Sequence, residues 1–93
     1  MVTLSELKAH LRIEFGEEDA LLSSLIQAAK AACEAFCMTA FEEPMPEPVR
    51  LAVLLFCGHF YANRENGDRT AYDAMIAAFR ALLWPYRDPT KLF

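Results

Sequence analysis

The 93-residue chain is poor in cysteine and glycine, with three residues of each. Three thiols cannot all pair within one chain, which excludes a disulfide framework that uses every cysteine. The N-terminal residues lack the basic start and apolar core of a signal peptide, so we expect free thiols in a reducing cytoplasm. Scarce glycine and the lack of any short repeat also exclude a fibrous protein.

Motifs of the common catalytic and nucleotide-binding sites are missing as well. The sequence has no nucleophile elbow, no P-loop, no dinucleotide-binding glycine pattern and no HExxH pair. Its acidic cluster, residues 17–19, suits the solvated first turn of a helix, where carboxylates favour the positive end of the helix dipole. We therefore expect no enzymatic activity and no cofactor.

Basic residues are outnumbered by acidic ones. Nine Lys and Arg against thirteen Asp and Glu give a net charge of −4, which is unsuited to holding DNA by counterion release. Residues 1–48 carry three basic and nine acidic side chains, a balance of −6, and residues 49–93 carry six and four, a balance of +2. This opposition favours head-to-tail contacts between copies of the chain.

Apolar side chains, in contrast, are abundant. They make up 55% of the chain, against about 45–50% in globular domains, and the length allows one domain spanning residues 1–93. Because so small a core cannot hide them all, part of the apolar surface should meet another protein. The run Leu51–Ala62 is shorter than the about 20 residues of a membrane-spanning helix, and we expect no membrane partner.

Hydrophobic spacing predicts helices throughout and nowhere shows the alternation typical of strands. Thr3 and Glu6 form a capping box that opens a first helix, which ends near Arg12. An alanine-rich segment that starts at the acidic cluster forms a second helix, to about Cys37. A proline-containing loop, residues 39–48, separates this pair of helices from the rest of the chain.

The third helix covers the apolar run and is apolar on all sides, so we expect it to be the centre of the fold. Replacing Phe56 by Ala should then cost about 3–5 kcal/mol. A fourth helix is capped by Thr70 and stopped by Pro85, and residues 86–93 form an extended tail. The predicted fold is all-α, with four helices arranged as two helical hairpins joined by the proline-containing loop.

A candidate metal site combines two predicted helices. Cys33 and Cys37 stand at i and i+4 on the second helix, and Cys57 and His59 lie on the third. Four such ligands can bind zinc tetrahedrally, but structural zinc sites usually include a C-x2-C turn, which is absent. Free cysteine is also among the most buried residue types, so buried thiols and a core or interface histidine are the favoured interpretation.

The end of the chain has the composition of a protein interface. Trp84-Pro85-Tyr86 is hard to accommodate in so small a core, and aromatic and Arg side chains are enriched at interface hot spots. Packing of Trp84 and Tyr86 back onto the third helix is an equal alternative. Together with two residues at the end of the third helix, the candidate interface residues are Arg64, Glu65, Trp84, Tyr86, Arg87, Leu92 and Phe93.

Several stretches, taken together, resemble a known family. They are Val2–Ile13 followed by Glu18–Ala29, Pro46–Arg50 leading to His59–Glu65, and Leu82–Arg87. In this order they resemble the head–tail connector (adaptor) proteins of tailed bacteriophages and prophages, which are also labelled DNA-packaging proteins. The most specific features are the Asn-Arg-Glu helix end and the late Leu-Leu-x-Pro-Tyr-Arg.

The resemblance implies a structural protein without catalysis that assembles into a ring of about a dozen copies. Such a ring docks under the portal protein, meets a tail or stopper protein, and extends a channel through which DNA passes without sequence-specific binding. It implies the host cytoplasm before assembly and the virion neck afterwards. Relatives often have a Gly/Pro-containing link where Thr70–Ala81 is a regular helical pattern, which affects docking near the C-terminus.

Two other classes of function compete with this one. A small helical adaptor or regulatory protein of a bacterial cell would form a closed dimer that binds a partner, with no tendency to form rings. A metalloprotein would carry stoichiometric zinc after purification in chelator-free buffer.

Overall fold

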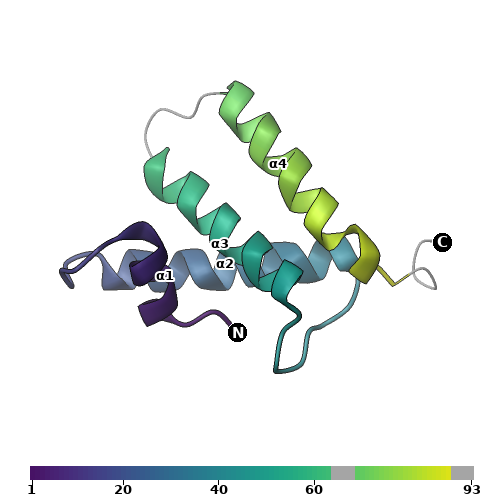
Figure 1. Ribbon diagram of the computed structural model, residues 1–93, viewed down its shortest axis with the longest axis horizontal. Helices are drawn as coiled ribbons and strands as arrows, with labels where there is room; N and C mark the ends of the chain where they lie inside the picture. Colours follow the sequence, from purple (N-terminus) through teal and green to yellow (C-terminus); the bar gives the residue numbers. More distant parts are fainter. Residues whose placement is uncertain (64–68, 89–93) are drawn as a thin grey trace.

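Four α-helices and one short 3-10 helix make up the computed structural model, which describes residues 1–63 and 69–88. The elements are α1 (Leu4–Leu11), α2 (Asp19–Cys37), α3 (Glu47–Ala62), α4 (Arg69–Leu83) and η1 (Trp84–Tyr86). The described residues contain no strand, and the predicted all-α fold of four helices is confirmed. In Figure 1, α2 lies behind α3 and α4, which run side by side, and α1 covers the N-terminal half of α2.

The first helix is set by its capping box. The amide of Glu6 donates to the Thr3 hydroxyl at 3.1 Å, and the amide of Thr3 donates to the Glu6 carboxylate at 3.3 Å. The helix ends at Leu11, and Arg12 caps it in the left-handed region at φ 60°. This agrees with the end near Arg12 that the sequence predicted. Leu7 is fully buried, and Leu4 and Leu11 are partly buried against the same core.

The second helix supplies one wall of the core. Its buried side chains recur at intervals of three and four residues: Leu22, Ile26, Ala29, Cys33 and Cys37. Among the described residues, α2 is the one helix whose length and mean hydropathy would suffice to cross a bilayer. Its buried face packs inside the subunit, as in a core helix, mainly against α3.

The third helix lies between α2 and α4 and also contacts α1, as expected of the centre of the fold. It begins at Glu47, with Pro48 in its first turn, where a missing amide proton costs no hydrogen bond. Its end is closed by Asn63, whose side-chain amide donates to the carbonyl of His59 at 2.9 Å.

Two details near the C-terminus differ from prediction. Helix α4 begins at Arg69, so Thr70 lies inside its first turn rather than at the cap. Tyr86, predicted to begin the extended tail, is instead the last residue of a 3-10 turn, Trp84–Tyr86, because Pro85 cannot continue an α-helix but its fixed φ suits the start of a tighter one. Arg87 is extended, as predicted, and residues 89–93 lie outside the described residues.

Ion pairs join the two oppositely charged halves within one subunit. Arg50 on α3 pairs with Glu6 on α1, and with Glu47 at 2.5 Å. The Tyr61 hydroxyl, near the end of α3, donates to Glu18 at 2.6 Å, just before α2. Part of the charge opposition seen in the sequence is therefore used to hold the subunit together.

Phe56 tests the role of α3. Its ring lies 4.7 Å from that of Phe60 and 5.9 Å from that of Phe79, but it is only half-buried. We therefore expect Phe56→Ala to lower the free energy of unfolding by about 2–3 kcal/mol, less than the about 3–5 kcal/mol of a fully buried ring. Denaturant unfolding measures this change.

Phe15, whose side chain is 49% exposed, provides the matched control. Phe15→Ala should cost less than about 1 kcal/mol, because little apolar area returns to water. Equal losses in the two variants would contradict a central position of α3.

Candidate protein-binding surfaces

The C-terminal turn places an exposed tryptophan beside a stacked arginine. Trp84 is 63% exposed, and its ring centroid lies 6.5 Å from that of Phe36 near the end of α2. The guanidinium carbon of Arg87 lies 4.8 Å from the Phe36 ring centroid and 5.2 Å from that of Trp84. Cation–π attraction to the two rings holds the guanidinium in place.

Two contacts fasten this turn to the end of α2. The amide of Asp88 donates to the carbonyl of Cys37 at 2.9 Å, and the thiol of Cys37 donates to the carbonyl of Leu83 at 3.6 Å. Trp84 therefore packs beside α2 with much of its surface free, while Tyr86 is half-buried against the core. Of the two alternatives for these aromatics, core packing describes Tyr86 and exposure describes Trp84.

Arg87 keeps hydrogen-bonding capacity unused. Its Nε atom is buried and has no hydrogen-bond partner, and the side chain forms no ion pair within residues 1–63 and 69–88. A buried donor without a partner costs free energy, and a planar guanidinium is well suited to a carboxylate.

Three of the predicted interface residues, Trp84, Tyr86 and Arg87, thus come together at one corner of the subunit. The remaining four lie outside the described residues: Arg64, Glu65, Leu92 and Phe93. Phe36 near the end of α2 supports both Trp84 and Arg87. Its separation of nearly fifty residues from Trp84 left no local signal of this contact.

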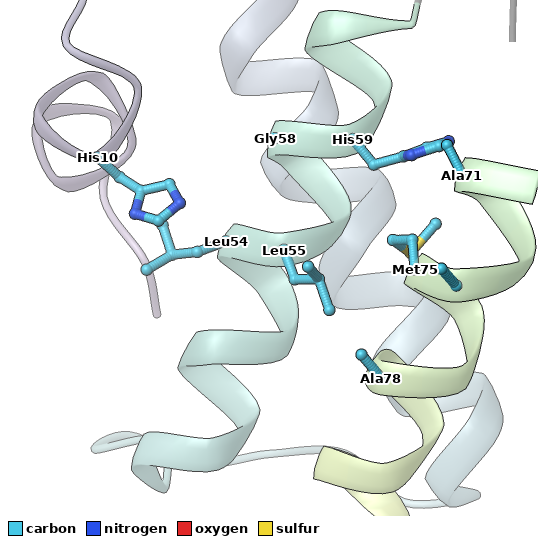
Figure 2. Close-up of a pocket in the computed structure, with 9 residues that line it drawn as sticks. His10, Leu54, Leu55, Gly58, His59, Ala71, Met75 and Ala78 are labelled. Carbon is cyan, nitrogen blue, oxygen red and sulfur yellow. The ribbon is translucent and has the colours of Figure 1, made fainter. Parts of the chain in front are cut away.

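The cysteines are buried thiols spread over α2 and α3. Burial is the main reason that the pKa of Cys33 rises to about 12 and that of Cys57 to about 11, and the pKa of Cys37 is also raised. In the described part of the chain, no group of three or more His, Cys, Asp and Glu side chains is placed to hold a metal ion. On α3, the side chain of His59 points away from the side of the buried Cys57 and toward α4 (Figure 2).

A groove between α3 and α4 was not anticipated from the sequence. It consists of two adjoining cavities of about 470 Å³ and 280 Å³ that share His10, Leu54 and Leu55. Figure 2 shows that α3 forms one wall, α4 forms the other, and His10 of α1 stands at the edge. We call it the α3–α4 groove; its other lining residues are Leu51, Gly58, His59, Ala71, Ala74, Met75, Ala78 and Leu82.

The groove is apolar and open because of its composition. Gly58 on α3 and alanines at positions 71, 74 and 78 on α4 leave space between the helices. Among the described residues that line it, the polar side chains are two histidines, and none is a carboxylate, lysine or arginine. The spacing of the alanines by three and four residues was a usable signal, since it puts small side chains on one exposed side of α4.

These features describe a small all-α subunit with an exposed aromatic C-terminal turn and an open apolar groove between α3 and α4. The family model of phage gp6-like head–tail connector proteins matches residues 1–87. The chain therefore belongs to the phage gp6-like head–tail connector family. It is a structural component of the virion that associates with head and tail, not an enzyme, which decides against the dimeric cellular adaptor. No curated protein and no solved structure matches the chain.

The buried thiols predict how stability depends on pH. Cys33 and Cys57 bind their protons more tightly in the native state than in the unfolded state, where the thiol pKa is 9.0. The unfolded state therefore loses these protons first, and the free energy of unfolding should fall as pH rises from about 9 through about 12. Denaturant titrations at successive pH values measure the fall. In a Cys33→Ala/Cys57→Ala variant the free energy of unfolding should fall less steeply over the same pH range. An equal fall in variant and wild type would contradict the role of these two thiols.

Proposed function

We propose that about a dozen copies of the chain assemble into a ring in the virion neck. The ring docks on the portal protein on one side and meets a tail or stopper protein on the other. DNA passes through its channel without sequence-specific contacts. Before assembly the protein resides in the host cytoplasm. The proposal rests on family membership over residues 1–87 and on the two surfaces described above.

The observation that carries docking is the C-terminal turn. Trp84 offers a large exposed ring, and Arg87 offers a guanidinium that is already oriented by two aromatic rings. Aromatic and Arg side chains dominate interface hot spots because they bury much area at a low entropic cost. We assign this turn to the contact with the portal protein, through a carboxylate that pairs with Arg87.

The charge of the chain supports free passage of DNA. The net charge is −4, and several of the described cations are paired within the subunit, including Lys8 with Asp19 at 2.8 Å and Arg69 with Asp73 at 3.2 Å. A lining rich in unpaired Lys and Arg would hold phosphates and slow the DNA.

The four interface residues outside the described part of the chain keep their proposed roles. Arg64 and Glu65 follow the end of α3 and act in contacts within or between subunits. Leu92 and Phe93 are apolar residues that follow the anchored Asp88. They extend the docking surface of the C-terminal turn.

Arg87→Ala tests docking at the turn. The variant should fold, with a loss of about 1–2 kcal/mol from packing on Phe36 and Trp84, because the guanidinium makes no ion pair in the described structure. Joining of heads to tails in a complementation assay should fall by at least about tenfold, the effect of removing about 1.4 kcal/mol of binding.

The matched control is Arg80→Ala, which removes an exposed Arg from α4. It should complement like the wild type. If Arg87→Ala also complements fully while remaining folded, the C-terminal turn is not the docking surface.

Truncation tests the segment beyond Asp88. A chain that ends at Asp88 keeps the hydrogen bond to Cys37, so its helical circular dichroism should be unchanged. It should fail to join heads to tails, because Leu92 and Phe93 are missing. Full-length Leu92→Ser/Phe93→Ser should fail similarly and Thr90→Ala/Lys91→Ala should complement; full activity of the truncated chain would make the segment dispensable.

A further inference from the structure

The exposed side of α2 is uncharged along its whole length. Six exposed positions follow one another at alternating intervals of three and four residues, and we call them the outer seam: Leu21, Ser24, Ala28, Ala31, Ala35 and Met38. The two large apolar side chains stand at its ends, with Leu21 38% and Met38 40% exposed. A helix that faces water normally carries charged residues on that side, so the seam has the composition of a covered surface.

The outer seam points away from the subunit core. With 3.6 residues per turn, its positions lie on the opposite side of α2 from the buried residues such as Ile26 and Cys33. The alternating spacing is the pattern by which one helix packs along others. The small side chains in the middle of the seam would allow the neighbouring backbone to come close.

The α3–α4 groove opens on the other face of the molecule. Among its α3 residues, Leu51 lies on the opposite side of that helix from the buried Val53, and Leu55 lies opposite both Val53 and Cys57. Figure 2 shows the groove in front of the α3–α4 pair, with α2 behind it, and Figure 1 shows the same order. The subunit measures 43 × 32 × 17 Å, so the two surfaces lie on the two broad faces of a thin body.

We propose that the outer seam of α2 in one copy packs into the α3–α4 groove of the next copy, an inference that rests on the ring proposed above. The two surfaces match in character: the described residues of both are mainly apolar, and none of them is an acidic side chain, a lysine or an arginine. Leu51, which is 49% exposed at one end of the groove, gains cover in the same contact.

Both surfaces are long enough for one helix to pack along the other. From Leu21 to Ala35 the outer seam runs about 21 Å at 1.5 Å per residue, and the groove follows α3 from Leu51 to His59. A contact between opposite faces of one chain leaves a free seam and a free groove at the two ends of every oligomer. It therefore adds copies until a rotation between them closes a ring, whereas a contact between identical surfaces stops at a dimer.

Charged substitutions at the two surfaces test the proposal. Ala31→Glu on the outer seam and Ala74→Glu in the groove should each weaken association by at least about tenfold, because an unpaired carboxylate would be buried. Ala77→Glu is the matched control, since it places the same charge on an exposed position of α4 outside the groove. It should associate like the wild type in sedimentation velocity and on tailless heads that display the portal protein.

Mixing the two variants distinguishes this contact from others. The Ala31→Glu copy keeps an intact groove and the Ala74→Glu copy keeps an intact seam, so the mixture should form one good contact and sediment as a heterodimer. Each variant alone should sediment as a monomer. A mixture without heterodimers, or homodimers of either variant, would overturn the pairing of seam with groove.

The outcomes also separate this inference from the proposed function. If both variants form rings and join heads to tails like the wild type, the seam–groove contact is wrong and the ring stands. If the wild type itself binds neither its own copies nor heads with the portal protein, the proposed function fails, and the pairing that rests on it fails with it.

Discussion

The packing of α2 against α3 is the contact on which the rest of the structure depends. One face of α2, from Leu22 to Cys37, closes on the buried side of α3, and the side chains there are mostly small or of medium size. This contact orients both helices. It turns the uncharged side of α2 outward, leaves the α3–α4 groove open on the other face, and brings the end of α2 to the C-terminal turn.

A subunit only 17 Å thick cannot bury an apolar content of 55% by itself. The surplus is distributed unevenly, on the outer seam of α2, in the α3–α4 groove and at Trp84. This distribution suits a head–tail connector, because such a protein functions in contact with other virion proteins. In the proposed ring, contacts with neighbouring copies would cover these surfaces and add to the stability of each subunit.

The C-terminal turn combines local structure with a long-range contact. Pro85 ends α4 and allows one 3-10 turn, and the hydrogen bond from Asp88 to the carbonyl of Cys37 then fixes the direction of the chain. That bond places Arg87 against Phe36, where the guanidinium rests on the ring faces of Phe36 and Trp84; in the part of the chain that the structure describes, no carboxylate pairs with it. The proposed portal contact would supply that carboxylate.

The sequence by itself determined the helices, because capping, proline positions and apolar spacing are local properties: the Thr3 capping box, the end of α1 at Arg12 and the end of α4 before Pro85 were all predicted. It also identified Trp84, Tyr86 and Arg87 as unusual. Only the tertiary structure decided that Trp84 rests on Phe36 and that α3 and α4 leave a groove beside Gly58. Periodicity states which side of a helix is apolar, but which neighbour covers that side, and which apolar side stays open, depends on how the helices pack.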